Sequence, residues 1–227
     1  MREIVLDTET TGFDPLTGHR VVEIGCVELF NHMATGEVFH TYLNPERDMP
    51  SEAEAVHGLS VTFLADKPLF PAIAEGLLTF IGESPIIAHN ASFDMNFINA
   101  ELRRAGKASL SMDRAIDTVG LARRKFPGAQ ASLDALCRRF QIDTSAREKH
   151  GALLDAKLLA QVYLELVGGR EPGLALISSE TAAIQTIAAE RVVRAPRPHT
   201  ASADELEAHK SFVASLKNAI WALEPTA

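Results

Sequence analysis

Two acidic residues, Asp7 and Glu9, lie at the end of a short apolar run near the start of the chain. Residues two apart on a β-strand project from the same face, so these two carboxylates would point the same way from the strand's end. Two like charges held this close are costly unless a cation lies between them. An isolated Asp-x-Glu is more commonly a pair of surface acids in a loop, so these two residues alone are weak evidence for a cation site.

Further candidate residues follow at two other places in the chain. Asp94 stands just past a predicted buried strand, in the first turn of a helix, where an acid also complements the positive end of the helix dipole. Asp155 interrupts the apolar face of a later helix, and an acid beside a buried stripe needs a partner. His150 sits just before that helix, about one turn from Asp155, so the two side chains could converge on one cavity. Asp117 is a rival acid, but its position at the start of a helix favours an N-cap role.

These residues together predict a particular chemistry. The carboxylates of Asp7, Glu9, Asp94 and Asp155 would form an oxygen-rich site for two divalent cations. Two such ions about 3.5–4 Å apart activate a water and stabilise the leaving oxygen during phosphodiester cleavage. Since an unperturbed histidine has a pKa of about 6.5, His150 suits the removal of the water proton near neutral pH.

The elements that must position these residues alternate along the first part of the chain. Three β-rich segments are expected over residues 4–6, 21–29 and 39–43, with a hairpin turn at Thr35-Gly36. Two further strands are expected at 86–88 and ending near Asp117. Helical spacing is found over 70–81, 92–105, 119–126, 133–140 and 151–167. Three antiparallel strands followed by βαβ units predict a mixed α/β sheet with helices on its faces.

The composition changes after Gly169, which divides the chain into three predicted parts. Residues 1–169 form the predicted folded domain, and residues 170–203 a linker that contains a basic, Pro-containing stretch. Residues 204–227 form a C-terminal segment, within which Asp204 to Glu224 has the spacing of a helix with one apolar face.

Charge and cysteine content limit the function classes further. The chain holds 22 Lys+Arg and 30 Asp+Glu, a net charge of -8, which argues against binding nucleic acid through bulk positive charge. A nuclease that brings divalent cations into an acidic site remains compatible with this charge. Cys26 and Cys137 are expected to be buried thiols in a reducing compartment. With no signal-peptide core and no apolar stretch of about 20 residues, we predict a soluble cytoplasmic protein.

Three segments resemble a known family. Residues 5–12, 89–94 and 150–156 look like the three exonuclease motifs of the DEDD superfamily, histidine branch. The linking segments 56–59, 123–128 and 132–137 resemble the proofreading (epsilon) subunits of bacterial DNA polymerase III within that superfamily. The resemblance covers roughly residues 3 to 169 in order and spacing.

The resemblance implies a ribonuclease-H-like fold and 3′→5′ exonuclease activity on the 3′ end of DNA, with Mg²⁺ or Mn²⁺. It implies that the metals are held by Asp7, Glu9, Asp94 and Asp155, and that His150 is the general base.

The resemblance also implies which residues touch the substrate. Glu52 and His57 would contact the terminal nucleotide beside Asp7 and Glu9, and the backbone near Thr8 to Thr10 would line its pocket. From the sequence alone, Glu52 and His57 are more simply a loop acid and a histidine that anchors a loop.

The resemblance suggests partners for the tail. In the family, a flexible C-terminal segment tethers the exonuclease to the polymerase (alpha) subunit, and Asp204 to Glu224 is the candidate anchor here. The alternative is a helix that docks back on its own domain. Many relatives carry a Gln-led sliding-clamp motif after the exonuclease domain, but residues 170–176 lack the glutamine, which predicts at most weak clamp binding. Some relatives bind a small accessory subunit, about which the sequence is silent.

Two alternative functions stay open. A free-standing RNA 3′→5′ exonuclease, similar to oligoribonuclease, fits the same acids, but it needs no tail of about 58 residues. A non-catalytic scaffold subunit of the polymerase would not need an intact set of acids with His150.

Overall fold

The structure is a computed structural model that describes residues 1–145, 147, 149–169 and 200–217. The chain divides into two compact units, Met1–Ala175 and Leu176–Ala227, which are described separately.

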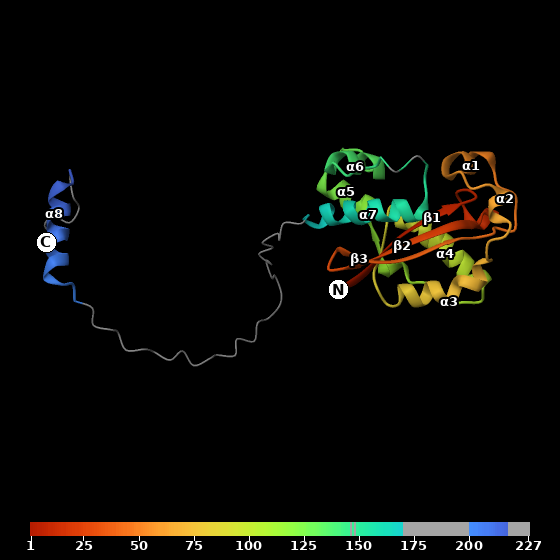
Figure 1. Cartoon of the computed structure of the whole chain (residues 1–227), viewed down its shortest axis with the longest axis horizontal. Coiled ribbons are helices and arrows are strands. Elements are labelled where there is room, and N and C mark those ends of the chain that lie inside the picture. Colours follow the sequence, from red (N-terminus) through yellow and green to blue (C-terminus); the bar gives the residue numbers. More distant parts are fainter. Residues whose placement is uncertain (146, 148, 170–199, 218–227) are drawn as a thin grey trace. The chain divides into compact units, whose positions relative to one another are not determined.

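The first unit is built on one five-stranded mixed sheet (Figure 1). Its strands are β1 (Arg2–Thr10), β2 (Val21–Phe30), β3 (Met33–Tyr42), β4 (Ile86–Ala88) and β5 (Ala115–Asp117), in the order β3-β2-β1-β4-β5. Strands β1, β2 and β3 pair antiparallel, and β4 and β5 run parallel to β1. This confirms the expected ribonuclease-H-like arrangement.

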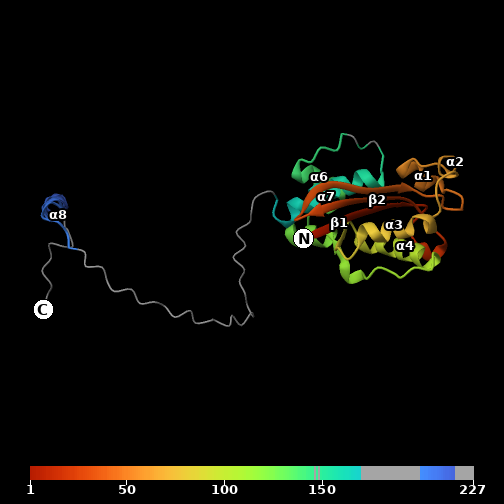
Figure 2. The same ribbon diagram turned by 60° about the horizontal axis from the view of Figure 1, so that its bottom comes forward.

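Helices cover both faces of the sheet (Figure 2). One face carries α3 (Phe70–Ile81) and α4 (Ala91–Arg104), and the other carries α5 (Thr118–Lys125), α6 (Leu133–Phe140) and α7 (Ala152–Val167).

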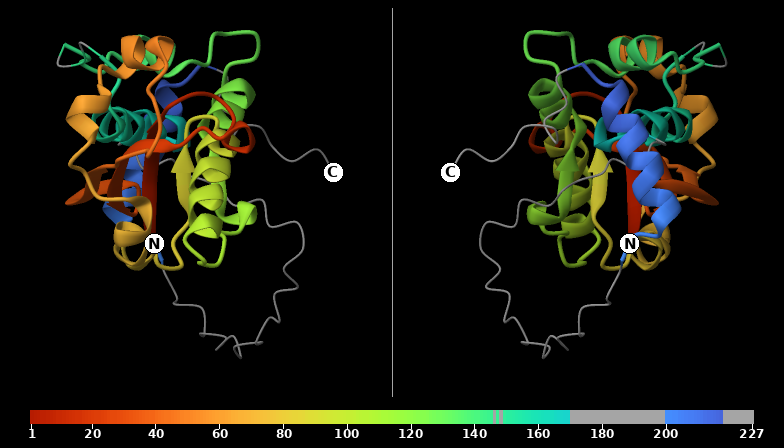
Figure 3. Two further views of the ribbon diagram at one scale, coloured as in Figure 1. Left: turned by 90° about the vertical axis from the view of Figure 1, so that its right-hand side faces the viewer. Right: turned by 90° about the vertical axis from the view of Figure 1, so that its left-hand side faces the viewer.

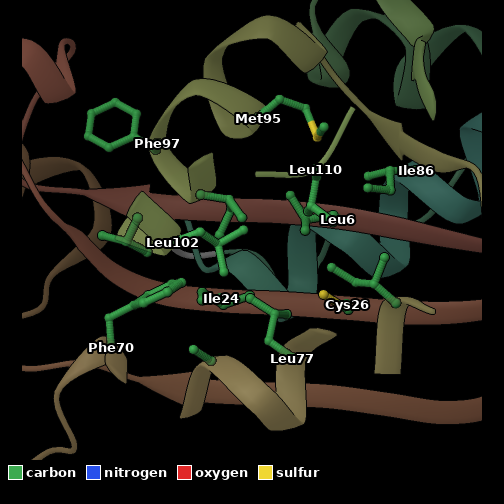
Figure 4. Close-up of a cluster of buried hydrophobic side chains, with 14 of the residues drawn as sticks. Leu6, Ile24, Cys26, Phe70, Leu77, Ile86, Met95, Phe97, Leu102 and Leu110 are labelled. Carbon is green, nitrogen blue, oxygen red and sulfur yellow. The ribbon is translucent and has the colours of Figure 1, made fainter. Parts of the chain in front are cut away.

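The period-two alternation of β1 separates the two cores. Ile4 and Leu6 pack into the core under α3 and α4, drawn in Figure 4, whereas Val5 packs into the core under α5, α6 and α7. Cys26 and Cys137 are free and buried, one in each core, as expected.

The turn between β2 and β3 differs from the expected one. Phe30 pairs with Met33, so the two-residue loop is Asn31-His32 rather than Thr35-Gly36. Both loop residues have positive φ, 50° and 67°, as a type I′ hairpin requires, and Asn tolerates that conformation. Gly36 instead has φ 99° beside an irregularity in the register between Val27 and Leu29.

Two short helices that the sequence did not predict lie after β3. They are α1 (Ser51–His57) and α2 (Val61–Leu64). Figure 3 (left) looks onto the end of the sheet where β1 finishes, with these helices and the loop after β1 toward the viewer. Short 3-10 turns, η1 (Pro15–Thr17) and η2 (Met112–Arg114), complete the described elements of this unit.

The second unit contains α8 (Ala203–Ser215), which begins where the sequence predicted a helix. The Ser202 side chain accepts from Glu205 N–H, and Glu205 accepts from the Ser202 backbone, which completes a capping box. No residue of α8 is buried. Residues 170–199 and 218–227, which hold most of the expected linker and the end of the expected helix, lie outside the described residues, so the three-part division stays a prediction.

Within the part of the chain that the structure describes, no helix is both long enough and apolar enough to cross a membrane.

Candidate active site

The acidic residues gather where β1 and β4 end. Since β1 and β4 are parallel, their carboxyl ends lie at the same edge of the sheet. Asp7 and Glu9 stand in the last part of β1, and Asp94 follows β4 in the first turn of α4. The Thr8 hydroxyl, on the opposite face of β1 from these two acids, donates to Asp94 Oδ1 at 2.7 Å, which ties β1 to α4 inside the molecule.

The first turn of α7 reaches this edge because β2 has a glycine where they meet. Gly25 is the partner of Asp7 across the β1–β2 ladder. A Cβ atom on Gly25 would lie 2.3 Å from the carbonyl carbon of Ala152 and from the nitrogen of Leu153. Any side chain at position 25 would therefore push α7 away, and with it Asp155, which is buried in the first turn of α7.

Burial and mutual repulsion shift the titration of these acids. Burial, and next the charges of Asp94 and Glu9, raise the pKa of Asp7 well above its ordinary value. Burial, and next the charges of Asp155 and Glu23, raise the pKa of Glu9 to about 8. Burial also raises the pKa of Asp94 to about 7, although the hydrogen bond from Thr8 opposes this shift. Such a cluster binds cations well, because a divalent cation relieves the repulsion and displaces the protons.

Glu23 is a fifth acid in this region that the sequence analysis did not single out. It pairs with Glu9 across the ladder, is buried, and its Oε1 lies 2.7 Å from His40 Nε2. The strand register and the partner on β3 are what place it here, and neither is visible in the sequence before the strands are aligned.

His150 and Asp155 converge as the sequence predicted. His150 Nδ1 lies 3.2 Å from Asp155 Oδ2, and the His150 side chain is about half exposed. One ligand atom each from Glu9, His150 and Asp155 lies within 4.8 Å of the others, a spacing that a metal ion can bridge. The donors are mainly carboxylate oxygens, which Mg²⁺ and Mn²⁺ prefer, so the residues present fit a divalent cation.

Arg147 is the second residue that the sequence analysis missed. Its guanidinium donates to both carboxylate oxygens of Asp155 and to Asp134, and it contacts His150. Nothing in the sequence distinguishes this arginine from its neighbours, because the contact depends on how the loop before α7 folds back.

A cavity of about 360 Å³ adjoins the acids. It is lined by the end of β1 and the loop after it, by one side of α1 along its whole length, and by Phe93. Glu52 and His57 both line it, so α1 brings the two residues to the same cavity as Glu9. His57 is buried, and its Nδ1 accepts the Leu59 N–H at 3.0 Å.

Asp117 does not join the acids. Its carboxylate accepts from the backbone of Val119 and Gly120 and caps α5, as the sequence predicted.

Comparison with known proteins places this site in a family. The Exonuclease family model matches residues 4–163. "DNA polymerase III subunit epsilon" of Rickettsia felis is 48% identical over 95% of this chain and 97% of its own length. The chain belongs to this exonuclease family. The protein of the same name from Escherichia coli K12 is 41% identical to this family member over 92% of the chain and 91% of its own length.

Solved structures of other proteins share the fold. Exonuclease X in complex with 5′-overhanging duplex DNA is 25% identical, with a TM-score of 0.57 over 72% of this chain and 90% of its own. The nuclease domain of 3′hExo, a DEDDh family member bound to rAMP, is 18% identical, with a TM-score of 0.63 over 73% of this chain and 91% of its own. These comparisons confirm the predicted fold and the predicted 3′→5′ exonuclease, and the family is one that works with divalent metal ions.

Proposed function

We propose that this exonuclease proofreads for a bacterial replicative DNA polymerase. It would remove the mispaired 3′-terminal nucleotide of the primer strand and release it as a 5′-mononucleotide. The observation that carries the proposal is the convergence of four carboxylates and His150 beside a nucleotide-sized cavity. The near full-length similarity to proteins named DNA polymerase III subunit epsilon supports it.

Asp7, Glu9, Asp94 and Asp155 would hold two divalent cations, which we propose are Mg²⁺ or Mn²⁺. When bound, such ions lower the pKa of a water and offset the charge that develops on the phosphate. Thr8 keeps Asp94 oriented toward this position through its hydroxyl.

His150 would act as the general base. It is half exposed, so water reaches it, and it lies within 3.2 Å of Asp155, which orients the ring. In this role His150 takes one proton from the attacking water, and later releases it to solvent.

The cavity beside the acids would hold the terminal nucleotide. Because His57 Nδ1 accepts the Leu59 N–H, a neutral His57 ring carries its proton on Nε2. This Nε2 is buried, and the backbone of Thr10 at the end of β1 interacts with the ring. Burial lowers the pKa of His57, which favours the neutral ring. We propose that Nε2 donates to an oxygen of the terminal nucleotide and that Glu52 contacts the same nucleotide.

The tail would supply the polymerase contact. We propose that Asp204 to Glu224 binds the alpha (polymerase) subunit, since Leu206, Phe212 and Leu216 are exposed apolar side chains on or next to α8. A sliding clamp would bind weakly at most, and a small accessory subunit would be a further partner. The site of action would be the bacterial cytoplasm. A tethered enzyme receives its substrate at high effective concentration, which suits a chain with a net charge of -8.

The experiment that tests the proposal compares a 5′-labelled single-stranded DNA with an RNA of the same sequence, in Mg²⁺ and in EDTA. Metal-dependent shortening of the DNA from its 3′ end, with release of 5′-mononucleotides, is expected. Faster shortening of the RNA would favour the oligoribonuclease-like alternative. Cleavage of neither would favour the scaffold alternative.

A further inference from the structure

One guanidinium, that of Arg147, contacts three acidic or basic side chains around the site. Arg147 Nε donates to Asp155 Oδ1 and Nη2 donates to Asp155 Oδ2, both at 2.6 Å. Nη2 also lies 2.9 Å from His150 Nδ1, and Nη1 donates to Asp134 Oδ1. The Arg147 side chain is only 9% exposed, whereas that of Asp134 is 60% exposed. The guanidinium therefore spans from the interior of the site to its rim.

The contact with Asp155 uses the atoms that a cation would need. A guanidinium fork satisfies both oxygens of a carboxylate at once, and charge assistance makes these hydrogen bonds strong. A divalent cation would bind the same oxygens and would repel the guanidinium. Arg147 and a cation at Asp155 are therefore competitors.

The contact with His150 has a second consequence. The same nitrogen lies 3.2 Å from Asp155 Oδ2, so Arg147 and Asp155 both contact the ring through Nδ1. The guanidinium therefore holds His150 together with Asp155 in one set of contacts, and a change at Asp155 also changes the contacts of His150.

We propose that Arg147 is an internal counter-ion that holds Asp155 and His150 in an inactive pairing until a divalent cation takes Asp155. Cation binding then releases the guanidinium from Asp155 and frees His150 Nδ1. Asp134, already bound to Nη1, retains the displaced side chain at the rim. Arg147 thereby couples cation binding at Asp155 to the release of His150 from the guanidinium. The inference rests on the roles proposed above for Asp155 and His150.

The test measures Mn²⁺ binding to the full chain without DNA, by the electron paramagnetic resonance signal of free Mn²⁺. Arg147→Gln removes the positive charge that competes with the ion for Asp155, and it should tighten Mn²⁺ binding by about tenfold. Arg147→Lys keeps the charge without the fork and should fall between Arg147→Gln and the unaltered chain. Arg138→Gln removes the same charge from an exposed position on α6 and should leave Mn²⁺ binding unchanged.

Asp134→Asn gives a test with the opposite sign. Without its partner at the rim, Arg147 would stay on Asp155, so this variant should bind Mn²⁺ about threefold more weakly. The same substitution should have no effect in the Arg147→Gln background, because the competitor is already gone. The Asp134 side chain is 60% exposed, so Asp134→Asn should leave the fold intact. The measurement on this single variant therefore remains a test even if Arg147→Gln failed to fold.

The outcomes separate this inference from the proposed function. Weaker or unchanged Mn²⁺ binding in Arg147→Gln would mean that Arg147 supports the cation site, and would overturn the inference. An equal effect of Asp134→Asn in both backgrounds would also overturn it. If the unaltered chain bound no Mn²⁺ at all, the proposed cation site itself would fail.

Discussion

Gly25 gives the most direct structural test of how the fold assembles the site. In Gly25→Ala, the new Cβ would lie 2.3 Å from backbone atoms of Ala152 and Leu153, where ordinary contacts begin at 3.4 Å. Because these are backbone atoms on both sides, no side-chain rotation relieves the clash. The first turn of α7 must retreat by about 1 Å, and Asp155 and His150 move with it.

This displacement predicts a loss of activity larger than the loss of stability. Overpacking of this kind costs about 1–3 kcal/mol of unfolding free energy. A shift of about 1 Å in a catalytic group can cost about 100-fold in rate. We expect Gly25→Ala to remain folded at 25 °C and to lose about 100-fold in kcat/KM on single-stranded DNA.

The assay pairs urea unfolding with initial rates of 3′-end removal at saturating metal. Gly76→Ala is the matched control, because a Cβ at Gly76 in α3 would meet only Phe39, at an ordinary 3.7 Å. This control should keep full activity and gain up to about 1 kcal/mol, since alanine is the better helix former. A Gly25→Ala enzyme with unaltered kcat/KM would refute the reasoning that Gly25 sets the position of α7.

Three other predictions follow from the same contacts. Thr8→Val removes the hydroxyl that donates to Asp94. Since a hydrogen bond to a charged group contributes about 1.5–3 kcal/mol, kcat/KM should fall at least about tenfold. The assay is primer shortening, with Thr8→Ser as the control that keeps the hydroxyl. In EDTA, the melting temperature should fall as the pH rises from about 5 to 8. Burial raises the pKa of Glu9 to about 8, so over this pH range the folded chain binds more protons than the unfolded chain. A melting temperature that rises over this range would contradict the raised pKa of Glu9. Arg20→Ala should lower the free energy of unfolding in urea by about 3 kcal/mol, because it removes the bidentate partner of the buried Glu101 carboxylate. An unchanged unfolding midpoint would show that Arg104 alone is a sufficient partner for Glu101.

Much of the sheet and the acidic cluster could be predicted from the sequence. The apolar run before Asp7, the helical period behind Asp155 and the acid just after β4 each have a local signal in residue type and spacing. Parallel pairing of β1 and β4 then brings Asp7, Glu9 and Asp94 to one edge of the sheet without further information. The N-cap role of Asp117 was equally local, and it was confirmed.

The rest depends on contacts between distant segments. Gly25 looks like an ordinary residue of an apolar run, and only the approach of α7 makes its missing side chain necessary. Arg147 and Glu23 reach the site through a loop and a strand register that no short pattern specifies. The hairpin turn lies at Asn31-His32 and not at Thr35-Gly36, because Asn as well as Gly accepts positive φ, so glycine alone does not locate a turn. Helix α1, which carries Glu52 and His57, is too short for a clear helical period.

The measurement that tests the central claim most directly is the shortening of a 5′-labelled primer annealed to a template, with its 3′ end paired or mispaired, in Mg²⁺ or EDTA. The double variant Asp7→Ala/Glu9→Ala is run beside the unaltered chain. The account predicts that the unaltered chain removes the 3′ nucleotide in Mg²⁺ and not in EDTA, and that the double variant does not remove it. Removal should be faster at the mispaired end, because a mispair lowers the cost of freeing the terminal nucleotide. Equal shortening by the unaltered chain and the double variant would contradict the claim that these carboxylates form the active site.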